Sequence, residues 1–86
     1  MSYTVFILRR AEKELGQLRP ELYEQVRDAI RALGLEPRPP GSAKLSGRSG
    51  WRIRVSDYRV IYEIDEREQS ITVLHVGHRR DVYRRE

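Results

Sequence analysis

The sequence predicts an α+β fold in which a helical hairpin backs one face of a mainly antiparallel sheet of four strands. Apolar residues recur with helical spacing in the first part of the chain, and they alternate with polar residues from residue 51 onward. Helices followed by a run of strands are typical of this fold class. With 86 residues the chain has room for one core, so we expect a single domain spanning residues 1–86.

The first two elements are expected to be a strand and a helix in direct succession. The stretch from Tyr3 to Leu8 is apolar and β-prone, which favours a strand. The spacing becomes helical at Arg9, and Ala11, Leu15 and Leu18 form one apolar stripe. This helix should therefore pack through that stripe.

A second helix begins at Pro20, a residue that is tolerated in the first turn of a helix. Gly34 and Pro37 end it, and Glu36 to Ser42 is a loop by composition. Its buried face should consist of apolar residues three or four positions apart, namely Leu22, Val26, Ile30 and Leu33.

The segment from Trp51 to Val55 alternates between apolar residues and arginines. In a strand, successive side chains point to opposite faces of the sheet. The apolar residues at positions 51, 53 and 55 should therefore face the core, while Arg52 and Arg54 lie on the open face.

Two further strands are expected after short turns. Tyr58 to Ile64 forms the first of them, with both tyrosines on the core side and Arg59 on the open side. Ile71 to Val76 is almost wholly apolar, which is typical of an internal strand covered on both faces. His75 is interpreted as a surface or capping residue, and Gly77 to Glu86 as a short polar tail or helix outside the sheet.

Composition excludes several classes of site and protein. With no cysteine and only two histidines, the chain lacks disulfides, thiolate metal sites and the ligands of most zinc sites. No stretch approaches the roughly 18 consecutive apolar residues that span a bilayer, and the N-terminus has no signal pattern. We therefore expect a cytoplasmic protein with no metal, no cofactor and no membrane partner.

Positive charge is concentrated in two segments of a chain whose net charge is +4. Residues 44–59 hold five basic side chains and one acidic one, and residues 79–85 hold four arginines and one aspartate. Residues 60–78, between them, carry four acidic side chains and one arginine. If the fold brings the two basic segments together, they form a positive patch that attracts a polyanion such as RNA.

Four short motifs then suggest a family. They occur in order in the second half of the chain: Lys44-Leu45-Ser46-Gly47, Trp51-Arg52-Ile53-Arg54-Val55, Asp57-Tyr58-Arg59-Val60-Ile61-Tyr62 and Val76-Gly77-His78-Arg79-Arg80-Asp81-Val82-Tyr83-Arg84. Together with the order of the elements, they resemble the RelE branch of the RelE/ParE toxins over nearly the whole chain. The resemblance implies a RelE-like fold.

The resemblance also implies an activity and partners. RelE-type toxins of type II toxin–antitoxin systems are ribosome-dependent mRNA endonucleases, or mRNA interferases, that inhibit translation. A cognate RelB-like antitoxin neutralises such a toxin in a heterodimer or heterotetramer, and operator DNA is bound only through the antitoxin. The expected partners are therefore the antitoxin, the ribosome and mRNA.

Residue by residue, the resemblance assigns a catalytic set. Arg59 matches the family's catalytic arginine, Arg79 matches a second arginine after the last strand, and Tyr83 matches the C-terminal tyrosine. Arg54 belongs to the same set, at a strand position where well-studied members carry a lysine. The expected RNA-binding residues are the neighbouring basic residues, Lys44, Arg48, Arg52, Arg80 and Arg84.

The replacement of lysine by arginine bears on the chemistry. Metal-independent cleavage requires the ribose 2′-oxygen to attack the adjacent phosphate, so a proton must be removed and negative charge on phosphorus must be stabilised. Arginines suit the second task as fixed donors, but with a pKa of about 12.5 or more they remain protonated and cannot act as a conventional base. His78 is the candidate that can replace the lysine as base, and Asp81 is a weaker one.

Two other functions remain open on the sequence. A ParE-like toxin that inhibits DNA gyrase has the same fold, although that branch generally lacks the arginine and C-terminal tyrosine set. A degenerate family member that only binds antitoxin or RNA would fit the missing lysines. An antitoxin segment rich in acidic and apolar residues should dock on the arginine face, by strand addition or as an amphipathic helix.

Overall fold

The computed structural model describes residues 2–78, and its elements follow the predicted order with one addition. They are β1 (Thr4–Ile7), α1 (Arg9–Gly16), α2 (Pro20–Leu33), β2 (Ala43–Lys44), β3 (Trp51–Val55), β4 (Tyr58–Asp65) and β5 (Ser70–His78). The α+β class is therefore confirmed.

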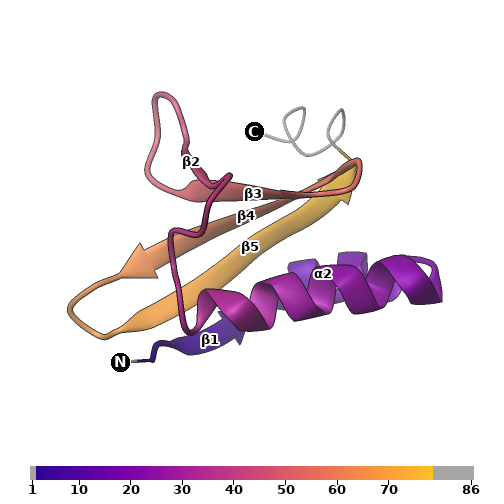
Figure 1. Ribbon diagram of the computed structural model, residues 1–86, viewed down its shortest axis with the longest axis horizontal. Helices are drawn as coiled ribbons and strands as arrows, with labels where there is room; N and C mark the ends of the chain where they lie inside the picture. The colour runs from indigo at the N-terminus through magenta and orange to yellow at the C-terminus, as the bar shows by residue number, and fades with distance from the viewer. Residues whose placement is uncertain (1, 79–86) are drawn as a thin grey trace.

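The strands of residues 2–78 form one sheet with the order β1-β5-β4-β3-β2 (Figure 1). β1 runs parallel to β5, and every other neighbouring pair is antiparallel. The mainly antiparallel sheet is confirmed, but it has five strands in this part of the chain rather than four. The additional strand β2 has only two residues, too few to show an alternating pattern in the sequence.

The helical hairpin packs against one face of this sheet. α1 contacts β5 most extensively, and α2 contacts both β1 and β3. Neither of these helices is long and apolar enough to cross a membrane. The core between helices and sheet contains the predicted apolar stripes, with Ala11, Leu15, Leu22, Val26, Ile30 and Leu33 from the helices and Ile53, Val60, Tyr62, Ile71, Val73 and Val76 from the strands.

Aromatic residues contribute to this core as predicted. Tyr62 is fully buried and donates its hydroxyl hydrogen to the carbonyl oxygen of Pro37 at 2.7 Å. Burial raises the pKa of the Tyr62 phenol. Trp51 and Tyr58 are half-buried against the same core. The Tyr62 hydrogen bond ties the loop after α2 to the middle of β4.

The last strand is longer than predicted. Gly77 and His78 pair with Arg59 and Tyr58 in the ladder between β4 and β5, so they belong to the sheet and not to a tail. Backbone N–H and C=O groups at the start of β4 need partners, and these two residues provide them. The internal position of β5, between β1 and β4, is confirmed.

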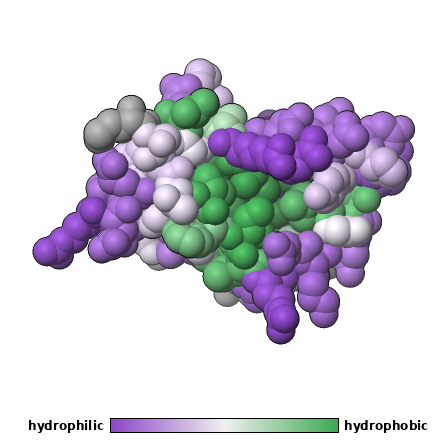
Figure 2. Space-filling view, turned by 90° about the horizontal axis from the view of Figure 1, so that it is seen from below, coloured by the Kyte–Doolittle hydropathy of each residue, from purple (hydrophilic) through white to green (hydrophobic). Residues whose placement is uncertain are grey.

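Hydrophobic side chains also reach the surface at the β1 edge of the sheet. β1 is the edge strand there, and the side chains of Phe6 and Leu8 are 55% and 44% exposed. β1 lies near the bottom of Figure 1. Figure 2 shows the molecule from below, with a hydrophobic strip flanked by hydrophilic residues. This edge therefore differs from β3, near the other edge of the sheet, which carries arginines.

Candidate RNA-binding face

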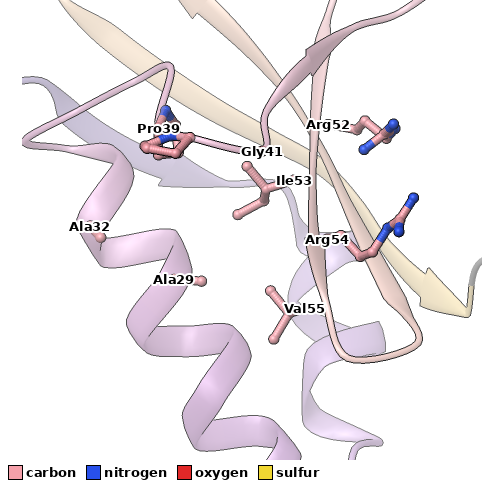
Figure 3. Close-up of a pocket in the computed structure, with 9 residues that line it drawn as sticks. Ala29, Ala32, Pro39, Gly41, Arg52, Ile53, Arg54 and Val55 are labelled. Carbon is pink, nitrogen blue, oxygen red and sulfur yellow. The ribbon is translucent and has the colours of Figure 1, made fainter.

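Strands β3 and β4 bring three arginines onto one face of the sheet. Arg54 lies directly opposite Arg59 in the antiparallel register, and Arg52 lies opposite Ile61. Directly paired residues point to the same face, with Cβ atoms about 4.5–5.5 Å apart. Figure 3 shows the side chains of Arg52 and Arg54 pointing away from α2. The predicted arginine face is therefore confirmed as a geometric feature.

The alternate residues of the same strands face the helices. Ile53 pairs with Val60, and both belong to the hydrophobic core. Figure 3 shows Ile53 and Val55 directed toward α2. Strand alternation therefore separates an apolar layer from a cationic one within β3.

Arg59 is the most enclosed of the three arginines. Its side chain is only 7% exposed, and its strand partner on β5 is Gly77, which has no side chain to cover or pair with it. The Nε atom of Arg59 is buried and has no hydrogen-bond partner among residues 2–78. Buried polar groups are normally hydrogen-bonded, and phosphate oxygens are strong acceptors for guanidinium donors. The geometry of Arg59 therefore suits an anionic ligand.

The other two arginines are more accessible. Arg54 is exposed and Arg52 is half-buried. In the described part of the chain, neither guanidinium forms an ion pair with a carboxylate. Their charge is therefore available to a ligand that approaches the β3–β4 hairpin.

The charge on this face reverses along β4. Arg59 lies near the start of the strand, and the same alternation places Glu63 and Asp65 on the same face near its end. A phosphate backbone is attracted by the arginine end and repelled by the acidic end. The separation of a basic cluster from an acidic tip, expected from the sequence, is therefore present in the fold.

The acidic tip is held to the N-terminal part of the chain. The Tyr3 hydroxyl donates to Glu66 Oε1 at 2.6 Å, and Arg38 Nη2 lies 2.7 Å from Glu66 Oε2. The hydrogen bond from Tyr3 and the contact with Arg38 lower the pKa of the Glu66 carboxyl group. Residues 2–78 contain no cluster of three or more histidine, cysteine or acidic side chains that could hold a metal ion.

His78 is not brought together with the arginine pair. It lies opposite Tyr58 in the ladder, with the two rings in an edge-to-face contact at a centroid distance of 5.7 Å and an interplanar angle of 80°. Its neighbour Gly77 pairs with Arg59, so alternation directs the His78 side chain to the opposite face.

His75 is buried, so its interpretation as a surface residue is wrong. Its side chain is 2% exposed, and Arg10 Nη2 lies against its Nε2 atom. Glu14 Oε2 is 3.8 Å from its Nδ1 atom. Because arginine can only donate, Nε2 accepts and the ring proton of a neutral His75 sits on Nδ1, toward Glu14. The histidine is covered because α1 packs on this part of β5.

Lys44 and Arg48 lie apart from the arginine pair. Lys44 is opposite Trp51, at the other end of β3 from Arg54, and its Nζ donates to the carbonyl oxygen of Arg48 at 3.3 Å. The structure therefore does not bring these two expected RNA-binding residues to the Arg54–Arg59 pair. The remaining expected site residues lie outside the described residues: Arg79, Arg80, Asp81, Tyr83 and Arg84.

Sequence reasoning missed Gly77 as a component of this face. Its position opposite Arg59 means that β5 places no side chain next to Arg59 at this point of the ladder. An isolated glycine within an apolar strand often marks a close approach by another group. The sequence therefore offers a signal at Gly77, although a glycine that follows an apolar run also favours the end of a strand.

Comparison with known proteins identifies the family of this fold. Residues 5–83 match the ParE toxin family of type II toxin–antitoxin systems. The chain belongs to this family. Toxin RelG of Mycobacterium tuberculosis is 33% identical over 87 residues, which cover 99% of this chain and 100% of RelG.

Solved structures of RelE proteins resemble the toxin closely. The archaeal RelE–RelB complex from Pyrococcus horikoshii OT3 contains a chain with a TM-score of 0.82 and 30% identity, covering 92% of this toxin and 97% of that chain. The isolated E. coli RelE toxin has a TM-score of 0.79 and 27% identity, covering 98% and 94%. The toxin therefore has the RelE-like fold and is a member of the RelE/ParE superfamily.

Proposed function

We propose that this toxin is a ribosome-dependent mRNA endonuclease that inhibits translation and cleaves without a metal ion. The observation that carries the proposal is the pairing of Arg54 with the enclosed Arg59, whose buried Nε has no partner among residues 2–78. Two guanidinium groups on one face provide a fixed cationic site for a scissile phosphate. Similarity to RelE toxins and to RelG supports the same activity.

In the proposed reaction, the ribose 2′-oxygen attacks the adjacent phosphorus atom. The bond from the 2′-oxygen to phosphorus forms as the bond from phosphorus to the 5′-oxygen breaks, which leaves a 2′,3′-cyclic phosphate and a 5′-hydroxyl. One proton leaves the 2′-hydroxyl and one is given to the 5′-oxygen. Arg59 and Arg54 stabilise the negative charge that develops on the phosphate oxygens, because their donors are already in position.

Arg54 is assigned an electrostatic role in proton removal. Arginine stays protonated, so Arg54 lowers the barrier to ionisation of the 2′-hydroxyl without accepting its proton. The candidates for the acceptor are His78 and Asp81. The register of β4 and β5 directs His78 away from Arg59, which argues against His78. Arg79 and Tyr83 are proposed to complete the site, the first on the phosphate and the second stacked on a nucleotide.

RNA binding beyond the scissile phosphate is proposed to depend on the surrounding basic residues. Arg52 continues the arginine face along β3. Lys44 and Arg48 are proposed to contact a more distant part of the RNA or ribosome, since they lie at the other end of β3. Arg80 and Arg84 are proposed to act from the chain beyond β5.

The proposed regulatory partner is a RelB-like antitoxin. Several structural relatives of the toxin were solved as RelE–RelB complexes, including those from Pyrococcus horikoshii and Methanococcus jannaschii. A toxin with this fold and family membership is therefore expected to form a complex with its own antitoxin, and through it to reach operator DNA.

The decisive experiment is a cell-free translation reaction with a defined mRNA. The toxin is expected to cut the message only when ribosomes are present. Arg59→Ala should lower the cleavage rate by about 10²–10³-fold. Arg67→Ala, a control at an exposed position in the acidic turn, should not. Intact mRNA with folded wild-type toxin and active ribosomes would exclude the proposed activity.

A second candidate function is inhibition of DNA gyrase, and the match to the ParE toxin family favours it. A supercoiling assay with purified gyrase distinguishes the two candidates. If the toxin inhibits gyrase, wild type and Arg59→Ala should both block supercoiling, and mRNA should stay intact in the translation assay. That combination of results would replace the proposed nuclease activity by inhibition of gyrase.

A further inference from the structure

The outer side of the edge strand β1 carries backbone groups that have no partner among residues 2–78. In the parallel ladder, the N–H groups of Thr4 and Leu8 donate, each at 3.0 Å, to carbonyl oxygens at or next to β5. Because alternate residues of a strand direct these groups to opposite sides, the N–H and C=O groups of Val5 and Ile7 point away from the sheet. No backbone hydrogen bond joins Val5 or Ile7 to another described residue on that side.

Exposed hydrophobic side chains gather around this edge. In the described part of the chain, the large hydrophobic residues that are exposed are Phe6, Leu8 and Leu35. The first two lie in β1 or directly after it. Leu35 follows Gly34, whose carbonyl oxygen accepts the N–H of Tyr3 at 2.6 Å, at the start of the same edge. An apolar surface therefore borders the free backbone groups, and Figure 2 shows a hydrophobic strip on this side of the molecule.

The strand also lacks the features that usually keep an edge strand from pairing. Natural edge strands are protected by charged side chains, prolines, bulges or a covering element. The four residues of β1, from Thr4 to Ile7, include neither a charge nor a proline, and their register with β5 is continuous. A strand of this kind can add a further strand to the sheet through its free N–H and C=O groups.

Opposite charges flank the two ends of β1. At its start lies Glu68, in the turn that leads into β5 and next to Gln69, whose carbonyl oxygen accepts the N–H of Thr4. At its end, α1 begins with Arg9 and Arg10. Arg9 and Glu68 are exposed, and neither forms an ion pair within residues 2–78. A second copy of the strand, running antiparallel, would place each basic end beside the acidic end of the other.

We propose that the toxin forms a symmetric dimer in which the β1 strands of two copies pair antiparallel. In a twofold arrangement the same strand serves both sides of the interface. With Phe6 of each copy opposite Phe6 of the other, Val5 pairs with Ile7 of the other copy, and the outward N–H and C=O groups of both residues gain partners. The two Phe6 side chains lie on the same face, where they bury each other.

The same register brings the charged ends together and leaves the arginine face open. Arg9 of one copy lies across from Tyr3 of the other, near that copy's Glu68, and the symmetry repeats this contact at the other end of the strand pair. β5 separates β1 from β4, so the strand pairing does not cover Arg54 or Arg59. The dimer therefore neither depends on the proposed nuclease activity nor blocks its site.

Sedimentation equilibrium of the purified toxin at graded concentrations tests the pairing. Wild type should pass from a monomer of 10.2 kDa to a dimer as its concentration rises. Phe6→Lys should raise the Kd of the dimer by about tenfold or more, because a charge replaces the apolar contact at the centre of the strand pair. Gln25→Lys, the matched control, adds the same charge at an exposed position on α2 and should change the Kd by less than about twofold.

An exchange of charges tests the antiparallel orientation. Arg9→Glu and Glu68→Arg should each raise the Kd of the dimer by about threefold or more, because like charges then meet at both ends of the strand pair. The double variant Arg9→Glu/Glu68→Arg should return the Kd to the wild-type value. Within one chain the two residues lie at opposite ends of β1, so recovery requires a contact between copies. Single losses that the double variant does not reverse would contradict this orientation.

Amide hydrogen exchange distinguishes strand pairing from a contact between side chains alone. The N–H groups of Val5 and Ile7 should exchange rapidly in dilute toxin and slowly at concentrations above the Kd. The N–H of Leu8, which is bonded to the carbonyl oxygen of Val73, is the internal control and should be protected at both concentrations. Rapid exchange at Val5 and Ile7 in the dimer would overturn the pairing of the strands.

Three other results would also overturn the proposal. The first is a wild-type toxin that stays monomeric up to about 1 mM, a concentration at which even weak complexes form. The second is a Phe6→Lys variant that has the circular dichroism spectrum of wild type and dimerises equally well. The third is protection of the Val5 and Ile7 amides only after the antitoxin is added to monomeric toxin, which would assign the edge to a strand of the antitoxin.

Discussion

The carboxylate of Glu14 in α1 accepts the backbone N–H of Val76 in β5 at 2.8 Å, across 62 positions of sequence. The edge strand β1 pairs with β5 only as far as Val73, and α1 then continues along the same edge. Beyond Val73, the Glu14 side chain therefore supplies a hydrogen-bond acceptor that a neighbouring strand would otherwise provide to β5. This contact holds α1 against the part of β5 that pairs with the arginine-bearing end of β4.

Removal of the Glu14 carboxylate should destabilise the fold. Glu14→Ala leaves the Val76 N–H without its acceptor and should lower the free energy of unfolding by about 1–3 kcal/mol. Glu14→Gln retains an acceptor oxygen and should lose less. Urea unfolding followed by circular dichroism measures both values. Glu12→Ala, an exposed neighbour on α1, is the control and should stay within about 0.5 kcal/mol of wild type. Equal losses at positions 12 and 14 would contradict the role of this contact.

The link between Tyr3 and Glu66 makes a prediction about pH. The hydrogen bond from Tyr3 lowers the pKa of the Glu66 carboxyl group in the folded protein. A lowered carboxyl pKa contributes stability above the pKa of the unfolded chain, and this contribution is lost as the pH falls through the folded value. In Tyr3→Phe, the pKa of Glu66 should rise toward its ordinary value.

The measurement is an NMR titration of the Glu66 side-chain carbonyl carbon in wild type and Tyr3→Phe. Arg38→Gln removes the second contact of Glu66 and should shift the pKa in the same direction, since the ion pair at 2.7 Å also favours the charged carboxylate. An unchanged titration midpoint in both variants would show that neither contact persists in solution.

The buried faces and the arginine face were predictable because they depend on local periodicity. Apolar spacing in α1 and α2 and alternation in β3 specify which side of each element is buried. This holds regardless of which other elements pack against that side. The alternation in β3 therefore correctly separated Ile53 from Arg52 and Arg54.

Features that depend on pairing between distant segments were not predictable in the same way. β2 is a strand only because Ala43 and Lys44 meet β3, and a register shift beside Ile61 inserts one extra residue into β5. A period of two cannot be continued through such a bulge. The burial of His75 likewise depends on Arg10 and on the path of α1, which no local pattern in β5 reveals.

Two glycines should respond in opposite ways to the same substitution. Gly50 has a φ of +119°, and a Cβ atom there would lie 3.1 Å from Leu45 Cδ1, so Gly50→Ala should lower the free energy of unfolding by about 1–3 kcal/mol. Gly16 in α1 has no atoms within 4 Å of the added Cβ, and Gly16→Ala should increase stability by about 0.5–1 kcal/mol. Thermal unfolding of both variants tests the pair. A loss of stability in Gly16→Ala would contradict the open surroundings of that residue.

The opposed directions of Arg59 and His78 separate their roles in the proposed cleavage. Arg59 shares a face with Arg54, whereas His78 contacts Tyr58 on the other side of the sheet. Arg59→Ala should lower the single-turnover rate of mRNA cleavage on the ribosome by about 10²–10³-fold, as for the loss of a preorganised donor to an oxyanion. His78→Ala should lower it by less than about tenfold, since loss of a true general base typically costs about 10²–10⁴-fold.

The same assay identifies the proton acceptor. If Asp81 is the base, Asp81→Asn should lose far more activity than His78→Ala, and the rate of the wild-type toxin should fall as the pH drops through the carboxylate range. A rate that falls near pH 6 to 7 instead, and no longer does so in His78→Ala, would assign proton removal to the histidine. That result would require the end of β5 to turn His78 toward Arg59 when RNA binds.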